Sequence, residues 1–375
     1  MVDLAIKSLF HDKTRLLITL CGVAFAVTLV LSQVGLFLGL LNNASVTIEN
    51  CRAHLWIASH SSPNVDFGHT FSDRYVHRVR AVPGVKRADN LIVYYLPVVQ
   101  PSGAVVTTIV YAMKNFSAWG LPWDVRQGNL DDLRRGSNIF IDESAGRTFD
   151  PFALGEYRET QGYRLQIVGT TKGAVSFTTY PMMFLDISTM RSVLPDLTEG
   201  QTTFVLVELE PDADVEQTRE ILRQRLPHHD VWTKAEWRQM SREYWIVTTG
   251  LGFNIFVTAA LGCLVGLVIV AQTLYASTLE HVHEYATFKA IGGNNKSIYW
   301  MLTKQAFICA VLGFLMGLCP VLAMQAWVPK LGLSLVTPAW LVASVFGGAV
   351  LLCLASATAS FRTIATVDPA LVFRG

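Results

Sequence analysis

Four long stretches without a charged side chain limit what this chain can fold into. Asp, Glu, Lys and Arg are missing from residues 16–48, 244–279, 305–329 and 331–361. About 20 helical residues span the roughly 30 Å hydrocarbon core of a bilayer, so each stretch is long enough for one crossing. A content of 51% apolar and 16% charged residues also argues against a wholly soluble chain. We therefore predict four transmembrane helices, over residues 16–41, 244–279, 298–328 and 337–361.

The positions of the basic residues predict the orientation of these helices. Residues 1–15 have one apolar face and carry Lys7, Lys13 and Arg15, which favours an elbow helix on the cytoplasmic membrane surface. Other basic residues that fall on the same predicted side are Lys289, Lys296, Lys304, Arg362 and Arg374. The opposite loop, 329–336, holds only Lys330. Both termini, including the tail 362–375, are therefore predicted to be cytoplasmic.

Residues 42–243 separate the first two predicted membrane helices and read as an extracytoplasmic α+β domain. Strand-like and helix-like segments alternate there, with turn residues such as Pro83-Gly84 and Pro101-Ser-Gly103 between them. The spacing predicts a β-α-β-β unit, an inserted lobe at about 114–200, and a returning β-α-β unit. The predicted fold class is thus a membrane protein with four transmembrane α-helices and a large α+β domain inserted between helices 1 and 2.

Two features of the predicted membrane helices concern motion and packing. The second run, 244–279, exceeds one span, so its start is expected to project as a stalk towards the α+β domain. Glycines four residues apart let helix backbones approach closely in lipid. Such pairs predict either a tightly packed bundle or a dimer seam, although glycine is also simply common in membrane helices: Gly35 and Gly39, Gly262 and Gly266, Gly313 and Gly317.

A short polar segment, 280–297, lies between the second and third predicted membrane helices. Tyr285, Phe288 and Ile291 recur at three-residue spacing among charged residues, which is typical of an amphipathic helix. Gly292 and Gly293 follow the last apolar residue, where a helix end favours a residue that tolerates positive φ. We expect a cytoplasmic coupling helix here, exposed to a soluble partner.

This segment also carries a family resemblance. Residues 284–293, EYATFKAIGG, resemble the E-x-x-x-x-[KR]-A-[ILM]-G segment of FtsX/MacB-type ABC transporter permeases. The surrounding run GLVIVAQTLYASTLEHVHEYATFKAIGG, together with EWRQMSREY at 236–244, resembles the DevC branch of that family. Asp368-Pro369-Ala370 is similar to the closing [DE]-P-[AV] signature of the family.

The resemblance implies a permease subunit of an ATP-driven exporter in a bacterial inner membrane. Two ABC ATPase subunits would bind beneath a homodimer of this chain and drive extracytoplasmic movements, a mechanism called mechanotransmission. A HlyD-like membrane-fusion adaptor and an outer-membrane channel are expected partners, and the cargo would be lipophilic or amphiphilic. The residues expected to couple to the ATPase are Glu280, Glu284, Tyr285, Phe288, Lys289, Ile291, Gly292 and Gly293.

Several other functions remain open at this stage. The chain could be an FtsX-like scaffold that regulates a cell-wall hydrolase, an HrtB-like exporter of haem or lipophiles, or a LolC-like lipoprotein-release subunit. Membrane lipid is an expected partner in each case. The formal net charge of +1 offers no footprint for nucleic acid.

The sequence gives no sign of a catalytic centre, a cofactor site or a metal site. The nearest approach to a phosphate-binding loop, residues 292–297, lacks the second glycine and a preceding strand. Neither His228-His229 nor His281-x-His283 has the i,i+4 spacing that binds zinc on a helix. No carboxylate lies in the predicted membrane cores, which disfavours an ion-coupled carrier. Five of the six cysteines lie in the apolar runs, so a disulfide framework is not expected.

Overall fold

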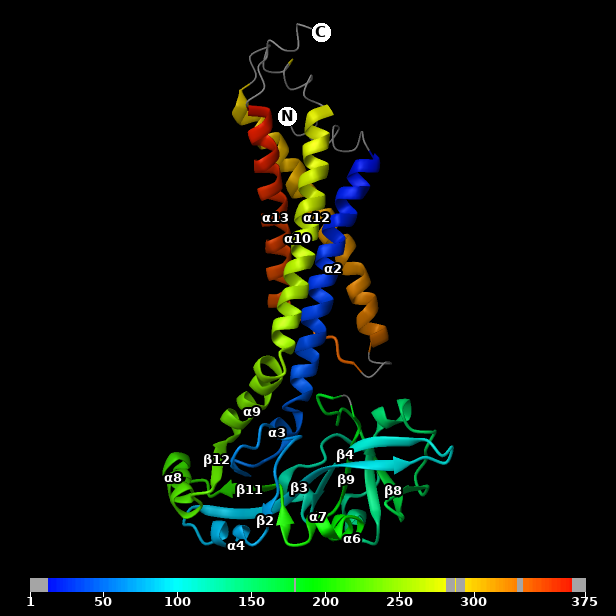
Figure 1. The fold of residues 1–375 in the computed structure, drawn as a ribbon, viewed down its shortest axis with the longest axis vertical. Helices are drawn as coiled ribbons and strands as arrows, with labels where there is room; N and C mark the ends of the chain where they lie inside the picture. Colours follow the sequence, from blue (N-terminus) through cyan, green and yellow to red (C-terminus); the bar gives the residue numbers. More distant parts are fainter. Residues whose placement is uncertain (1–12, 179, 281–286, 288–293, 329–332, 366–375) are drawn as a thin grey trace. The chain divides into compact units, whose positions relative to one another are not determined.

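The computed structural model describes residues 13–178, 180–280, 287, 294–328 and 333–365 (Figure 1). The described chain forms two compact units. A helical unit contains the residues up to Gly39 and most of those from Phe253 onward, and an α+β unit contains Leu40 to Gly252. Most of the predicted elbow helix, residues 1–12, lies outside the described residues.

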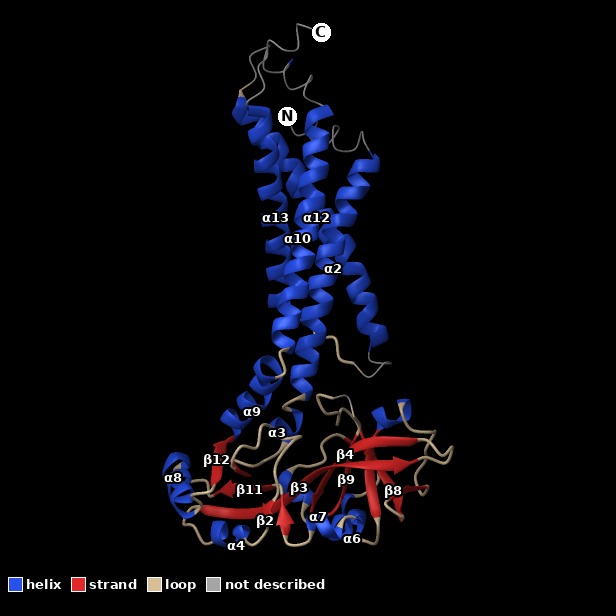
Figure 2. Cartoon of the chain, viewed as in Figure 1, coloured by secondary structure: helices blue, strands red, loops and turns tan. Residues whose placement is uncertain are grey.

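Four long helices make up the helical unit, and each is long and apolar enough to cross a membrane (Figure 2). They are α2 (Lys13–Asn43), α10 (Leu251–Glu280), α12 (Asn295–Trp327) and α13 (Ala339–Ala365). The four predicted membrane helices are therefore confirmed. The prediction is possible because the thickness of the bilayer sets the length of apolar helix that is needed to cross it.

The second membrane helix begins later than the sequence predicts. Tyr244–Thr248 forms a π-helical turn, in which the Thr249 N–H donates to the Tyr244 carbonyl at 3.2 Å. Gly250 then adopts a positive φ of 71°, a conformation that ends a helix and that glycine tolerates best. The run 244–279 is thus divided, and α10 starts only at Leu251.

One half of the α+β unit is a four-stranded antiparallel sheet in the order β12-β1-β11-β3. Its elements are β1 (Leu55–Ser59), α4 (Tyr75–Arg80), β3 (Val85–Val99), β11 (Phe204–Leu209), α8 (Val215–Arg225) and β12 (His229–Thr233). The helices α4 and α8 bury Val79 and Leu222 in one core with Ile57 and Val205 of the sheet. This arrangement has the predicted order of a β-α-β-β unit and a returning β-α-β unit.

The inserted lobe is a barrel, which the strand pairs close in the circuit β3-β4-β9-β6-β8-β7-β3. Its further strands are β4 (Val105–Met113), β5 (Val125–Gln127), β6 (Asn138–Asp142), β7 (Tyr157–Thr160), β8 (Tyr163–Thr171) and β9 (Met182–Asp186). Alternate residues, including Leu96, Val110 and Ile167, fill one apolar core. The long strand β3 is shared, since its first half pairs with β11 and its second half with β4.

Short elements connect these strands, and some of them cover a third apolar core. They are α3 (Val46–Asn50), β2 (Phe71–Ser72), α5 (Phe116–Trp119), η1 (Leu130–Arg134), η2 (Glu143–Arg147), α6 (Ile187–Val193), α7 (Pro195–Thr198), β10 (Gln201–Thr202) and α9 (Lys234–Glu243). Large rings fill this core, with Trp56 and Trp237 at 5.8 Å and 5.7 Å from Phe204. The core joins the four-stranded sheet to the outer surface of the barrel.

Candidate functional site

The predicted coupling segment lies between the helices α10 and α12. Glu280, the last described residue of α10, is exposed. The next helix, α12, begins at Asn295, and the Asn294 side chain caps it by accepting from the Lys296 N–H at 3.3 Å. Between them, Thr287 is helical and exposed. The remaining predicted contact residues lie outside the described residues: Glu284, Tyr285, Phe288, Lys289, Ile291, Gly292 and Gly293.

The helices α2 and α10 contact each other through small residues. A Cβ atom added at Gly262 would lie 2.7 Å from Leu29, and one added at Gly266 would lie 2.7 Å from Ala26. On the other helix, a Cβ at Gly22 would lie 2.5 Å from Ile269. Real side chains do not approach so closely, so these glycines allow the two backbones to pack directly.

The same helix α2 is held on a second side by α12. A Cβ at Gly313 would lie 2.6 Å from Val23, and one at Gly317 would lie 2.6 Å from the Ala24 carbonyl oxygen. The Thr28 hydroxyl also donates to the Gly317 carbonyl at 2.8 Å. Helix α2 therefore packs between two neighbours, and glycine residues lie in both contacts.

The remaining predicted glycines, Gly35 and Gly39, receive the extended segment that precedes α13. The Val336 N–H donates to the Gly35 carbonyl at 3.0 Å, and a Cβ at Gly39 would overlap the Ser334 carbonyl. All six predicted glycines thus face other elements of the same protomer.

One face of α10 is left uncovered by the described protomer. Of the apolar stretch of α10, 17% is buried, against 39% of that of α2. Large side chains lie along this face, and Phe253 and Phe256 are 73% and 70% exposed. Lipid or a second membrane helix can cover such a surface, since both are apolar.

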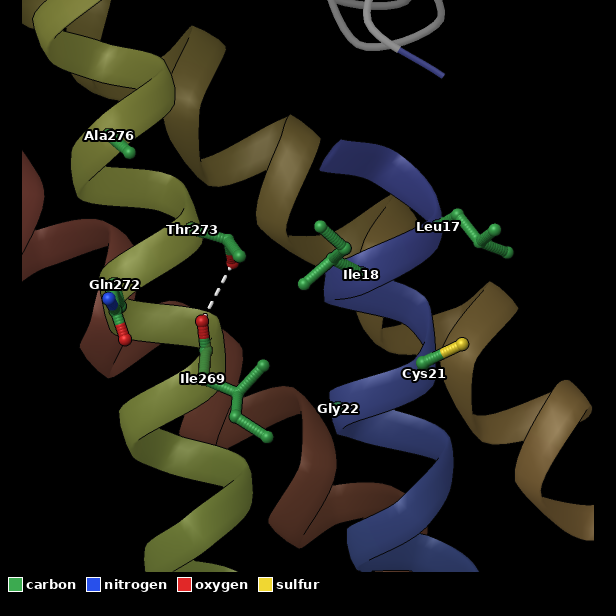
Figure 3. Close-up of a pocket in the computed structure, with 8 residues that line it drawn as sticks. All are labelled: Leu17, Ile18, Cys21, Gly22, Ile269, Gln272, Thr273 and Ala276. Atoms are coloured by element: carbon green, nitrogen blue, oxygen red, sulfur yellow. Dashed lines mark hydrogen bonds between the residues drawn. The ribbon is translucent and has the colours of Figure 1, made fainter. Parts of the chain in front are cut away.

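A groove of about 630 Å³ separates α2 from α10 beyond their glycine contacts (Figure 3). The Thr19 hydroxyl donates to the Thr273 hydroxyl at 3.0 Å, and the latter donates to the Ile269 carbonyl at 2.8 Å. Ile18 points towards α10, whereas Leu17 and Cys21 point away from it. The lining residues are Leu17, Ile18, Cys21, Gly22, Ile269, Gln272, Thr273 and Ala276. The groove lies on the side of Gly22 that is nearer to Glu280.

Comparison with known families decides what kind of protein has this architecture. Residues 16–225 match the model of the MacB-like periplasmic core domain, and residues 256–369 match that of the FtsX-like permease C-terminal region. The chain belongs to the MacB/FtsX family of ABC transporter permeases. It is therefore a multi-pass membrane protein, and an ABC permease implies a partner ATPase.

Relatives of this permease align over its whole length. An uncharacterized ABC transporter permease of Mycobacterium tuberculosis is 24% identical over 382 residues, and one of Mycobacterium bovis is 25% identical over 389 residues. Each alignment covers 100% of both chains. Among solved structures, the periplasmic region of MacB from Actinobacillus actinomycetemcomitans is similar, with 12% identity and a TM-score of 0.40. That comparison covers 51% of this chain and 94% of the MacB region.

In the α+β unit of the permease, an aromatic cluster surrounds the turn that precedes α10. Trp245 stacks on Phe177 with ring centroids 3.8 Å apart, and Phe67 stacks on Tyr95 at 5.7 Å. Trp245 and Phe67 are 6.0 Å apart, so the two pairs form one group. No sequence pattern indicates this cluster, because its residues lie in segments far apart along the chain.

A buried carboxyl group, Asp66, lies next to this cluster. The Tyr111 hydroxyl donates to it at 3.2 Å, and both side chains are buried. Burial raises the pKa of Asp66 to about 7, although the Tyr111 hydrogen bond opposes this shift. Asp66 is therefore a group whose charge changes near neutral pH.

Of the two histidine pairs in the sequence, the structure describes His228-His229. His229 lies between Phe71 and Tyr75, at centroid distances of 4.6 Å and 4.5 Å, and burial lowers its pKa. His281 and His283 lie outside the described residues. Within the part of the chain that the structure describes, no group of three His, Cys, Asp or Glu side chains could hold a metal ion.

Proposed function

We propose that this permease is the membrane subunit of an ATP-driven exporter that works by mechanotransmission. In this proposal it lies in a bacterial inner membrane with both termini in the cytoplasm. Two ATPase subunits bind the segment between α10 and α12, and their closure moves the α+β unit. The movement expels a lipophilic or amphiphilic cargo.

The observation that carries the proposal is the path of α10. The described part of this helix has 30 residues: its first two, Leu251 and Gly252, belong to the α+β unit, and its last is Glu280, where the predicted coupling segment starts. At 1.5 Å per residue it is about 45 Å long. A continuous helix transmits displacement along its length because its backbone hydrogen bonds resist bending.

The contacts of α10 support a pivoting movement. Gly262 and Gly266 rest closely on α2, against the side chains of Leu29 and Ala26. The groove lies beyond these contacts, on the side of Glu280, and leaves space for that end of α10 to tilt. Helix α2 is held by α12 as well, so we expect it to stay fixed while α10 moves.

We further propose a homodimer in which the exposed face of α10 forms part of the interface. The six predicted glycines are already used within the protomer, whereas Phe253, Phe256 and Leu264 are exposed. A contact between the two α10 helices would link both coupling segments to both α+β units.

A HlyD-like adaptor and an outer-membrane channel complete the proposed assembly. The inserted barrel supports adaptor binding, because it is a folded lobe with an apolar core of its own. Copurification from the native membrane distinguishes this exporter from an FtsX-like scaffold. An adaptor would support export, and a cell-wall hydrolase would support the scaffold.

The proposal is tested with the full permease and its partner ATPase, reconstituted in nanodiscs. The exposed Cys21, Cys263 and Cys319 are replaced by Ala, and Val105, which is 62% exposed, is replaced by Cys and spin-labelled. In a homodimer the two labels report one distance between the α+β units. ATP should change this distance.

Phe288→Ala then tests the coupling segment. We expect the variant to fold and dimerise but to lose the ATP-dependent distance change, because an apolar anchor for the ATPase is removed. Phe307→Ala is the matched control, since Phe307 lies on α12 and is 48% exposed. An unaltered distance change in Phe288→Ala would overturn the assignment of this residue.

A further inference from the structure

Trp245 lies at the point where the α+β unit leads into α10. The preceding helix, α9, is fixed to the rest of the unit, because Arg242 donates to Glu49 at 2.8 Å and to the Ser45 hydroxyl at 2.9 Å. After α9 the chain passes through the π turn and through Gly250. A π turn contains an extra residue, which changes the direction of the side chains that follow, and such turns are frequent at functional positions.

The Trp245 ring is held between segments from both halves of the α+β unit. Its plane is 12° from that of Phe177, at a centroid distance of 3.8 Å, which is a stacked pair. Phe177 belongs to the inserted lobe, between β8 and β9. On another side, Phe67 follows β1 and lies 6.0 Å away. Trp245 and Phe177 are 8% and 6% exposed, so the stack is largely shielded from solvent.

The segment that carries Phe177 is firmly attached to the barrel. The Ala174 N–H donates to the buried Asp142 carboxylate at 2.7 Å, and the Met182 N–H donates to the Ala174 carbonyl at 3.0 Å. Val175 forms a β-bridge with Pro181, which directly precedes β9. A displacement of Phe177 is therefore passed to β6, through Asp142, and to β9.

We infer that Trp245 is a positioning residue that makes the inserted lobe follow the movement of α10. Its stack on Phe177 stays closed while the two move together, and the shared strand β3 lets the lobe turn relative to the four-stranded sheet. This inference rests on the proposed function, since it assumes that ATP moves α10.

Hydrogen exchange of the full permease with its ATPase, with and without ATP, tests the inference. We expect ATP to change exchange in the lobe, at β6 and β9, in the wild type and in Trp245→Phe, which keeps an aromatic ring. Trp245→Ala should lose this change while the partner ATPase still hydrolyses ATP. Trp123→Ala is the control, because it removes an aromatic ring that lies 6.4 Å from Phe184 in the same unit but is not part of the Trp245–Phe177 stack, and it should leave the change intact.

Phe177→Ala tests the same stack from the side of the lobe, and it should lose the ATP-dependent change as Trp245→Ala does. A wild-type response in either variant would overturn the inference. If the wild type itself showed no ATP-dependent change, the proposed function would fail and this inference with it.

Discussion

The helical unit and the α+β unit depend on opposite kinds of residue for their internal packing. In the helical unit, Gly266 and Gly317 let backbones touch, and the contacts are lost when a residue becomes larger. In the α+β unit, Trp56 and Trp237 fill the core with large rings, and the contacts are lost when a residue becomes smaller.

The difference follows from the solvent. Lipid tails are as apolar as the helix side chains, so burying apolar area gives no gain between membrane helices, and close packing must stabilise them. In water, burying a large ring removes much apolar surface from the solvent and stabilises the fold. Substitutions that change size should therefore act in opposite directions in the two units.

Truncating the central ring of the α+β core should have the largest effect. Trp237 is fully buried between Phe204 and Trp232, at 5.7 Å and 6.4 Å. Trp237→Ala should lower the free energy of unfolding of this unit by about 3–5 kcal/mol, because a cavity replaces the ring. Denaturant unfolding of the full chain in detergent measures this loss. Trp300→Ala, at a site 55% exposed on α12, should leave the α+β unit unchanged.

Asp66 gives the α+β unit a dependence on pH. Burial raises the pKa of Asp66 from 3.8 to about 7, so between these values the folded chain holds a proton that the unfolded chain has released. The contribution of Asp66 to stability is then greatest below about pH 4, falls as the pH rises to about 7, and is smaller by up to about 4 kcal/mol above it. Asp66→Asn imitates the protonated group and should remove this dependence. Equal pH profiles for the variant and the wild type would contradict the assignment.

Enlarging a glycine should destabilise the helical unit. In Gly317→Leu the new side chain meets the Ala24 backbone, which cannot rotate away, and we expect a loss of about 1–3 kcal/mol from overpacking. Gly348→Leu on α13 is the matched control, since no atom lies within 4 Å of the Cβ position there. Thermal unfolding in detergent compares the two. Equal losses would show that close backbone approach at Gly317 does not stabilise the bundle.

The smallest effect is expected from the hydroxyl pair in the groove. Thr19→Val removes the hydrogen bond to Thr273 with little change of shape. Interhelical hydrogen bonds in membranes contribute about 0.6 kcal/mol on average, so the melting temperature should fall only slightly. A large fall would mean that polar contacts, rather than glycine packing, hold α2 to α10.

The architecture was predictable from sequence because it depends on local patterns. An uncharged run gives a membrane helix whatever surrounds it, and the run that starts at Leu16 became α2 with ends within a few residues of the prediction. The order of strands and helices in the α+β unit was likewise predictable from turn residues and periodicity. The closure of the lobe into a barrel was not, because the pairing of Val99 with Glu159 depends on tertiary contacts.

The sites were less predictable. The break before α10 falls among uncharged residues, and the π turn at Tyr244 depends on a hydrogen bond to Thr249 that hydropathy does not reveal. The cluster around Trp245 joins residues separated by more than sixty positions. The glycine pairs were found by spacing, but spacing does not say which neighbour each glycine contacts. The coupling residues around Phe288 remain a prediction.

A reversible lock between α2 and α10 tests the central claim most directly. Thr19→Cys and Thr273→Cys, whose hydroxyls are 3.0 Å apart in the native chain, can be joined by a disulfide after Cys21, Cys263 and Cys319 are replaced by Ala. Hydrogen exchange of the α+β unit is then followed with the partner ATPase and ATP. If α10 transmits the movement, cross-linking should abolish the ATP-dependent change and reductant should restore it. An ATP-dependent change that persists in the cross-linked protein would contradict the account.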